Sequence, residues 1–360
     1  MGRVVLVTGV ARYLGGRLAQ VLQEDPSVDR VIGVDVVPPT ADLGRAEFVR
    51  ADIRNPIISK VISSASVDTV VHMSVLAQPG HAGGRTIMKE VNVIGTMQLL
   101  AACQKAPSVR KLVVKSSTTV YGASPKDPAM FTEDMEPKAL PRSGFAKDSV
   151  EVEGYVRGFA RRRPDAHVTV LRFANLLGDK METPMSAYFA LPLIPTVLGF
   201  DPRLQVVHPD DGLECLRLCT VEDRPGTFNV AGDGVLLLSQ AIRRTGRPPL
   251  PLPSMLVSSV GGLVRRAQVV DFSPEQLRYL TFGRVVDTTR MRTQLGFEPS
   301  FTTSGTFDDF VRTRRLNARF PPETVASIER RVGSVLTGLT GLTGLPGVSA
   351  VTGVVGGGRG

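Results

Sequence analysis

The stretch TGVARYLGG, residues 8–16, decides the fold, because it joins a short apolar run to a longer amphipathic one. Gly9 and Gly15 allow the backbone to bend sharply and approach a diphosphate, while the helix that follows offers free N–H groups and the positive end of its dipole. Asp35 ends the next apolar run, twenty residues past Gly15. A carboxylate at this spacing accepts hydrogen bonds from a ribose 2′-hydroxyl and repels a 2′-phosphate. The pattern therefore predicts a dinucleotide site that favours NAD over NADP.

The first 175 residues alternate apolar runs with longer amphipathic stretches. This alternation predicts parallel strands joined by crossover helices that cover both faces of a sheet. Runs such as 112–114 are apolar without interruption, as expected for strands buried on both sides. The predicted fold class is α/β, a doubly wound parallel sheet of the Rossmann type with a smaller C-terminal substrate lobe. Strands are expected over 3–8, 30–35, 46–51, 69–73, 111–115 and 168–173, and helices over 14–22, 89–103 and 147–162.

The pattern changes after Gly178, where prolines become frequent and the apolar spacing becomes irregular. A strand-helix unit over 204–219, a strand over 227–230 and a helical region over about 236–282 are expected there. We predict an NAD-binding Rossmann domain over 1–180, rejoined by about 204–232, and a substrate-binding lobe over 181–203 and 233–320.

The last thirty residues have a composition of their own. Residues 331–360 contain ten glycines, and no charged residue falls within 332–358. An uncharged stretch of this length could cross a membrane, but its glycines, threonines and Pro346 make a poor helix. We predict a flexible Gly-rich tail over 331–360 without stable membrane insertion.

Composition excludes several classes of protein. Hydrophobic residues make up 42% and charged residues 21%, the balance of a globular protein with a sizeable core. The net charge is +9, but the basic residues are dispersed in short groups without a nucleic-acid-binding signature, so no nucleic-acid partner is expected. No two of the three cysteines have CxxC spacing, and the four histidines are scattered along the sequence, so no metal site is expected. The first apolar run lacks a charged leader and a cleavage site, which favours a cytoplasmic protein.

Further stretches match one family in the same order along the chain. The turn at 8–16 resembles the TGxxGxxG fingerprint of the extended short-chain dehydrogenase/reductase family, in its NAD-dependent epimerase/dehydratase group, which includes UDP-glucose 4-epimerase. SSTTVYG at 116–122 is similar to the family's SS(A/T)xVYG segment, and RFANLLG at 172–178 to its LRxxNxxG segment. Other matches lie at 51–54, 70–74, 91–96, 207–211 and 287–299, so the resemblance covers about residues 3–300.

The resemblance implies a bound NAD, a nucleotide-sugar substrate and a set of site residues. Ser117 matches the residue that hydrogen-bonds the reacting hydroxyl, and Lys147 the one that orients the nicotinamide ribose. The implied cofactor-binding residues are Gly9, Arg12, Tyr13, Leu14, Gly15, Asp35, Asp52, Ile53, Met73, Ser74, Asn92 and Lys147. The implied substrate-binding residues are Ser117, Asn175 and Arg203. Dimerisation through a helix pair is common in the family, so the resemblance leaves a homodimer as an open alternative.

Two positions depart from the family pattern, and the first is Arg12. It replaces the middle glycine of the fingerprint. A cationic side chain at this turn can pair with a phosphate. It can also reach the adenosine ribose and relax the preference for NAD, or point into solvent.

The second departure concerns the catalytic pair Tyr-x-x-x-Lys at the start of a helix. The lysine is Lys147, and Ser143 stands where the family has tyrosine. A phenol has a reference pKa near 10, whereas an aliphatic alcohol titrates several units higher, so Ser143 acting alone as a base is penalised by very roughly 8 kcal/mol. Other candidates for the acid/base are Tyr121, Lys147 itself, or a water bridged by Ser143.

The activity implied by the resemblance is redox chemistry on a nucleotide sugar. An oxidoreductase of this kind oxidises C4 of the sugar by hydride transfer to bound NAD, and epimerisation (an isomerase reaction) or dehydration follows. The missing tyrosine keeps two other hypotheses open. The first is a dinucleotide-binding protein with little or no catalysis, acting as a sensor or partner subunit. The second is a dehydrogenase of another hydroxy substrate.

Overall fold

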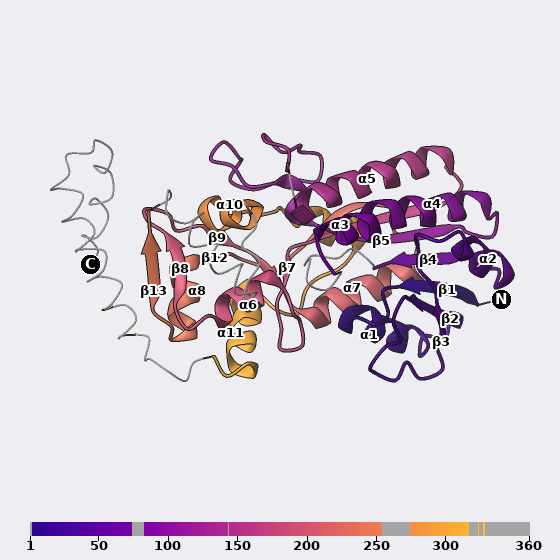
Figure 1. Ribbon diagram of the computed structural model, residues 1–360, viewed down its shortest axis with the longest axis horizontal. Coiled ribbons are helices and arrows are strands. Elements are labelled where there is room, and N and C mark those ends of the chain that lie inside the picture. The colour runs from indigo at the N-terminus through magenta and orange to yellow at the C-terminus, as the bar shows by residue number, and fades with distance from the viewer. Residues whose placement is uncertain are drawn as a thin grey trace.

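A seven-stranded parallel sheet forms one end of the molecule, beside the N-terminus (Figure 1). The computed structural model describes residues 2–73, 83–142, 144–253 and 274–316, with the single residues Glu323 and Ser327. The sheet order is β11-β6-β5-β4-β1-β2-β3, and all its strand pairs are parallel. The strands are β1 (Arg3–Thr8), β2 (Val28–Asp35), β3 (Glu47–Arg50), β4 (Thr69–His72), β5 (Lys111–Ser117), β6 (His167–Phe173) and β11 (Gly226–Val230). The predicted doubly wound α/β fold is confirmed.

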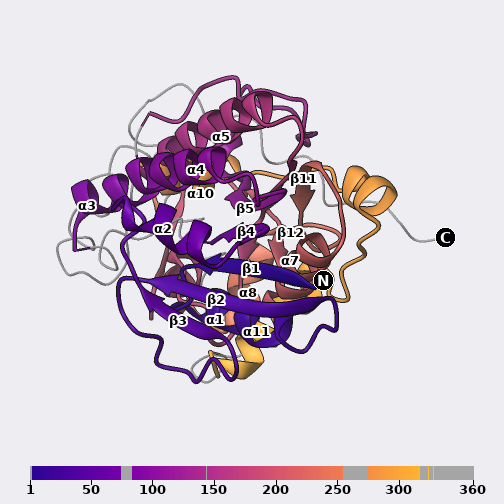
Figure 2. The same cartoon turned by 90° about the vertical axis from the view of Figure 1, so that its right-hand side faces the viewer.

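Helices cover both faces of the sheet (Figure 2). On one face lie α1 (Tyr13–Leu22) and α7 (Pro209–Val221), and on the other α2 (Ile57–Ser64), α4 (Thr96–Lys105) and α5 (Gly144–Arg162). Side chains alternate between the two cores along each strand. On β5, Val113 packs in the core of α1 and α7, while Val114 packs in the core of α2, α4 and α5.

The strand order reverses between β1 and β4. The chain runs from β1 outward to β3 and then returns to β4 on the other side of β1. In doubly wound sheets, ligands bind in the crevice outside the carboxyl ends of the strands at this reversal. The fold therefore brings the turn after β1, Asp35 at the end of β2 and Ser117 at the end of β5 to one edge of the sheet.

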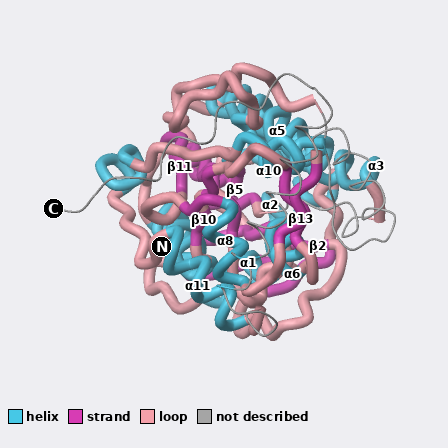
Figure 3. The backbone as a smooth tube through the Cα atoms, turned by 90° about the vertical axis from the view of Figure 1, so that its left-hand side faces the viewer, coloured by secondary structure: helices cyan, strands magenta, loops and turns pink. Residues whose placement is uncertain are grey.

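A second group of elements lies at the other end of the molecule, as Figures 1 and 3 show. Two strand pairs there join β8 (Ile194–Val197) to β13 (Pro249–Leu252) and β9 (Arg203–Leu204) to β12 (Leu236–Leu237). A third pair, β7 (Asn175–Leu176) with β10 (Val206–Val207), lies between this group and the large sheet. The helices are α6 (Pro184–Ala190), α8 (Leu238–Thr245), α10 (Pro274–Phe282) and α11 (Thr303–Thr313). Their apolar side chains share one core. The domain boundaries drawn from the sequence stay predictions.

Several predicted elements differ from the observed ones. The single helix expected over 89–103 is three pieces: α3 (Arg85–Lys89), the π-helical segment η2 (Glu90–Gly95) and α4. The region expected to be helical over about 236–282 contains the strand β13, and its residues 254–273 lie outside the described residues. The helices α2, α6 and α11 had no counterpart in the prediction. Two further short helices are η3 (Thr118–Tyr121) and η4 (Met291–Leu295).

Within the described residues, no helix is long and apolar enough to cross a membrane. No group of histidine, cysteine and acidic side chains gathers as metal ligands in those same ranges. The Gly-rich tail predicted over 331–360 lies outside the described part of the chain.

Candidate dinucleotide and substrate site

The turn between β1 and α1 has the geometry that its glycines predict. Gly9 has a φ of 78°, in the left-handed region that glycine adopts without steric cost. A Cβ atom at Gly15 would lie 2.3 Å from the carbonyl oxygen of Gly9, so the helix approaches the turn only with glycine there. Arg12 is the N-cap of α1 and Tyr13 its first residue, which leaves the N–H groups of the first turn free to bind an anion.

The carboxylate of Asp35 lies beside this turn. Its Oδ2 accepts a hydrogen bond from the Ala11 N–H (3.0 Å), and its Oδ1 accepts one from the Val36 N–H (2.7 Å). A carboxylate oxygen has further acceptor capacity after one such bond. Asp35 is therefore oriented by the turn and can still accept a hydrogen bond from a ribose hydroxyl.

The side chains at the start of α1 differ in their surroundings. Within the described ranges, the Arg12 side chain has no hydrogen-bond or ion-pair partner. Its burial lowers the pKa of Arg12, and the charge of Asp35 opposes that fall. Lys180 Nζ lies 6.0 Å from the ring centroid of Tyr13, and Leu14 is buried in the core beneath the turn.

Four of the cofactor-binding residues expected from the sequence follow the ends of β3 and β4, and Asp52 is the one expected to contact the adenine. Arg54 binds the Asp52 carboxylate through both oxygens, with Nη2 2.6 Å from Oδ2, and this hydrogen bonding lowers the pKa of Asp52. An adenine amino group would therefore share this carboxylate with Arg54. Ile53 and Met73 are buried, and the Met73 N–H donates to Thr8 Oγ1 (3.0 Å). The next predicted residue, Ser74, lies outside the described residues.

Asn92 contacts the start of α5. Its Nδ2 donates to Asp148 Oδ2 (3.1 Å), and Arg85 binds both oxygens of the same carboxylate at 2.7 and 2.6 Å. The Asp148 side chain has no exposed surface. Since Asp148 follows Lys147 in the helix, Asn92 and Arg85 fix the position of the turn that carries Lys147.

Ser117 and Lys147 lie on elements that pack together. Ser117 ends β5 and caps η3, where its Oγ accepts a hydrogen bond from the Thr119 N–H (3.2 Å). Val150, one turn after Lys147 on α5, packs against the apolar cluster that contains Val120 of η3. The Lys147 side chain is 44% exposed and its Nζ lies 3.8 Å from Glu151 Oε1. Ser143, expected in place of the tyrosine, lies outside the described residues.

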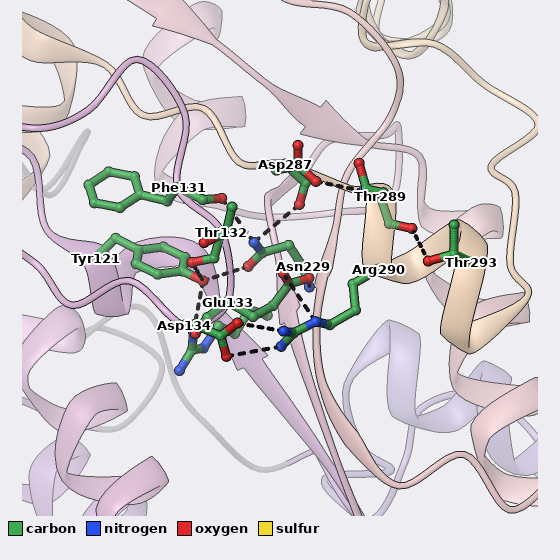
Figure 4. A network of polar contacts seen from close by, with 11 residues as sticks. Tyr121, Phe131, Thr132, Glu133, Asp134, Asn229, Asp287, Thr289, Arg290 and Thr293 are labelled. Carbon is green, nitrogen blue, oxygen red and sulfur yellow. Dashed lines mark hydrogen bonds and ion pairs between the residues drawn. The ribbon is translucent and has the colours of Figure 1, made fainter.

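The Tyr121 hydroxyl lies inside a polar network (Figure 4). Its Oη donates to Asn229 Oδ1 (2.8 Å) and accepts from Arg172 Nη1 (2.7 Å). The ring stacks on Phe131, with centroids 4.6 Å apart, and the residue is 1% exposed. Burial raises the pKa of Tyr121, although Arg172 opposes the rise. These contacts favour a structural role for Tyr121 over proton transfer to a substrate.

Replacing Tyr121 with phenylalanine is expected to lower the free energy of unfolding by about 1–3 kcal/mol, because Arg172 and Asn229 each lose a buried partner. Urea unfolding measures this loss, and Tyr155→Phe is the matched control because Tyr155 is 38% exposed on α5. Lost turnover with an unchanged unfolding free energy would instead make Tyr121 the acid/base.

The substrate-binding residues expected from the sequence lie where the two groups of elements meet. Asn175 opens β7, directly after the β6 end, and pairs with Val206 of β10. Arg203 is exposed on β9 and its Nη2 donates to the Ala129 carbonyl oxygen (2.9 Å). Arg203 therefore borders the loop after η3, although its guanidinium is partly engaged.

Three residues near the site carry chemistry that the sequence reasoning missed. Arg284 is buried, with its Nη1 donating to the Gly122 carbonyl (2.7 Å) and its Nε to Thr118 Oγ1 (3.3 Å), next to Ser117. Its guanidinium carbon lies 4.8 Å from the ring centroid of Tyr279. Burial raises the pKa of Tyr279, and Arg284 and Asn175 oppose that rise. The third residue, Lys115, interrupts the apolar strand β5, and that interruption was visible in the sequence.

The parallel sheet and the glycine turn with Asp35 beside it are the features of a dinucleotide-dependent enzyme. The sequence model of the NAD dependent epimerase/dehydratase family matches residues 5–223, and the chain belongs to this family. It is 51% identical over 333 residues to an uncharacterized protein of Mycobacterium tuberculosis, covering 91% of this chain and 89% of that protein. It is also 31% identical over 230 residues to UDP-glucose 4-epimerase 3 of Oryza sativa subsp. japonica, covering 58% of this chain and 60% of the relative.

Solved structures share the fold at lower identity. The UDP-glucose 4-epimerase of Thermotoga maritima, solved with UDP-glucose, superimposes with a TM-score of 0.66 at 19% identity, covering 88% of this chain and all of that one (100%). The dTDP-glucose 4,6-dehydratase of Bacillus anthracis, solved with NAD, has a TM-score of 0.65 at 18% identity, covering 88% and 98%.

Proposed function

We propose that this chain is an NAD-dependent enzyme that acts on a nucleotide sugar by transient hydride transfer, with epimerisation or dehydration as the net reaction. The observation that carries the proposal is the geometry of the β1–α1 turn with Asp35 beside it. The close approach of Gly15 to Gly9 leaves the backbone donors open, and the Asp35 carboxylate faces the turn. Membership of the family and the nucleotide sugars bound by its structural neighbours support the substrate class.

The chain's own residues fit the two halves of the cofactor. The turn would hold the diphosphate and Asp35 a ribose hydroxyl, which favours NAD over NADP because a 2′-phosphate would meet a carboxylate. When bound, NAD supplies a hydride acceptor at its nicotinamide ring. Lys147, held in place through Asp148, would bind the nicotinamide ribose and place a positive charge beside it.

On the substrate side, Ser117 is the hydrogen-bond donor to the reacting hydroxyl. Its Oγ already accepts from the Thr119 N–H, so its own proton remains to be donated. Asn175 would contact the sugar from β7, and Arg203 and the buried Arg284 would face its diphosphate. Because the Tyr121 hydroxyl is engaged, the acid/base role falls to Lys147 or to a water bridged by Ser143.

Fluorescence of the reduced nicotinamide tests this function. Protein loaded with NAD is titrated with a panel of UDP-, GDP- and dTDP-sugars, and we expect a rise with one of them. No rise with any sugar, although NAD binds, would exclude hydride transfer from this substrate class.

Lys147→Met is expected to lower the rate of hydride transfer by about a hundredfold or more, the usual contribution of a group that assists proton transfer. The side chain is partly exposed, so the fold should persist. Glu151→Gln is the matched control, because it removes the carboxylate 3.8 Å from Lys147 and leaves the amine. Equal rates in Lys147→Met and the parent protein would exclude Lys147 from the chemistry.

A second function is favoured by the missing tyrosine together with the burial of Tyr121. In that case the chain binds NAD and a nucleotide sugar with little or no turnover, as a sensor or partner subunit. Tight NAD binding, saturable sugar binding by calorimetry and an absence of nicotinamide reduction would establish it. The homodimer stays a prediction, which light scattering on the purified chain tests.

A further inference from the structure

The strand β5 carries two lysines on the same face of the sheet. Side chains alternate along a strand, so Lys111 and Lys115 lie on the same face as Val113, which packs in the core of α1 and α7. Lys111 has partners there, since its Nζ donates to the carbonyl oxygens of Thr220 (3.1 Å) and Glu222 (2.7 Å) and pairs with a carboxylate of the same loop. Across the described ranges Lys115 has no hydrogen-bond or ion-pair partner.

The position of Lys115 is level with the glycine turn. In the strand register, Thr8 is paired with His72 and His72 with Val114. The residues that follow these three, Gly9, Met73 and Lys115, therefore lie level with one another across the sheet. Two strand spacings separate Lys115 from Gly9, roughly 10 Å, and an extended lysine side chain covers much of that distance. The turn and the Lys115 side chain lie on the side of the sheet that α1 covers.

A second cation, which has no hydrogen-bond or ion-pair partner among the described residues, lies nearby. Arg12 caps α1, and its charge is close enough to lower the pKa of Lys115 further, after burial, to about 8. Two partly buried cations that repel each other are unfavourable unless anions compensate them, and Asp35 compensates Arg12 only in part. A diphosphate carries the two negative charges that would compensate them.

We propose that Lys115, together with Arg12, binds the diphosphate of the dinucleotide, so that this chain holds the diphosphate by side-chain cations as well as by the backbone of the glycine turn. The inference rests on the proposed function, because it places that diphosphate at the β1–α1 turn. Lys115 is a binding residue here, distinct from Lys147 on α5.

The groups that face Lys115 determine how its binding contribution changes with pH. The charge that acts on Lys115 is Arg12 from the turn, which Asp35 offsets in part. The His72 ring on β4 bonds Thr96 on the other side of the sheet, and burial, followed by the charge of Lys115, lowers the pKa of His72 to about 4, so that it stays neutral above pH 7. A bound diphosphate stabilises protonated Lys115 and so raises its pKa above that of the free protein. Affinity is therefore highest below about pH 8 and falls above it, by at most about tenfold per pH unit.

Calorimetric titration with ADP-ribose and with adenosine tests the inference on the full chain. For Lys115→Met we expect the Kd of ADP-ribose at pH 7 to rise about tenfold to a hundredfold, while the Kd of adenosine is unchanged. The fall in ADP-ribose affinity between pH 7.5 and 9.5 should be present in the parent protein and absent from this variant. Lys115→Arg, which keeps the charge, should retain most of the affinity.

Lys60→Met is the matched control, because Lys60 is exposed on α2, which covers the other face of the sheet from α1. Without ligand at pH 7, Lys115→Met should melt at the same temperature as the parent protein or higher, since it removes a desolvated charge. Unchanged ADP-ribose affinity in Lys115→Met, or equal weakening of ADP-ribose and adenosine, would overturn the inference and leave NAD binding intact. If the parent protein binds neither NAD nor ADP-ribose, the proposed function fails, and the inference fails with it.

Discussion

Arg172→Met is expected to lower the free energy of unfolding by about 3–5 kcal/mol, because it leaves a buried carboxylate without its cation. Arg172 lies on β6, and its Nη2 is 2.7 Å from Glu153 Oε2 on α5. The two side chains are 11% and 5% exposed. Burial lowers the pKa of Arg172, but the hydrogen bonds and charge of Glu153 outweigh it and raise this pKa above its ordinary value.

The same guanidinium joins other parts of the site. Its Nη1 donates to Tyr121 Oη (2.7 Å) and to the Glu133 carbonyl oxygen (3.0 Å), while Glu153 Oε1 accepts from Ser116 Oγ (2.6 Å). Methionine fills part of the volume but supplies none of these donors. Ser116 precedes Ser117, so the loss should also reach the segment that we propose binds the substrate and appear as a lower affinity for the substrate.

Urea unfolding with matched variants separates the buried pair from ordinary surface charge. Arg157 is the other cation near Glu153: its Nη1 lies 3.8 Å from Glu153 Oε2, and its side chain is 65% exposed. Arg157→Met should therefore change the free energy of unfolding by less than about 1 kcal/mol. The double variant Arg172→Met/Glu153→Met should recover part of the loss, because no charge is then left buried alone. A loss for Arg172→Met as small as that for Arg157→Met would contradict the role of this pair.

Gly15→Ala is expected to weaken binding of NAD by roughly tenfold to a hundredfold and to lower the free energy of unfolding by about 1–3 kcal/mol, the range of overpacking strain. The added Cβ would lie 2.3 Å from the Gly9 carbonyl oxygen and 2.9 Å from its carbonyl carbon. Both atoms belong to the backbone, so either the turn or α1 must move. The donors that would hold the diphosphate then lose their alignment.

Gly154→Ala on α5 is the control for this effect. There the nearest atom to an added Cβ is the Arg157 Nη2, at 3.9 Å, an ordinary contact. Alanine within a helix is more favourable than glycine by about 0.5–1 kcal/mol, so Gly154→Ala should be slightly stabilising. Unfolding by urea and NAD titration by calorimetry report both quantities. Equal NAD affinity in Gly15→Ala and the parent protein would show that the turn does not hold the cofactor.

The sequence predicted the sheet, and the edge at which we propose that the dinucleotide binds, from signals that are local. Apolar runs without alternation indicate strands buried on both faces, and β1, β2, β4, β5 and β6 lie within a few residues of the predicted ranges. The glycines of the β1–α1 turn are required by backbone geometry, which is a property of neighbouring residues. The π-helical segment within 89–103 was missed because the spacing of apolar residues over six positions does not distinguish a π-helical turn from an α-helical one.

Tertiary structure alone decided which side chains are engaged and which are free. Tyr121 was a candidate acid/base in the sequence, but its hydroxyl meets Asn229, 108 residues further on. Lys111 and Lys115 are equivalent in the strand pattern, yet only Lys111 finds partners among the described residues, in the loop after α7. A side chain's charge, hydrogen bonding and pKa depend on groups that the fold brings from distant positions. The sequence therefore determined the class of fold and predicted the place of the site. The packing of distant elements decided which side chains near that place are engaged and which remain free to bind or react.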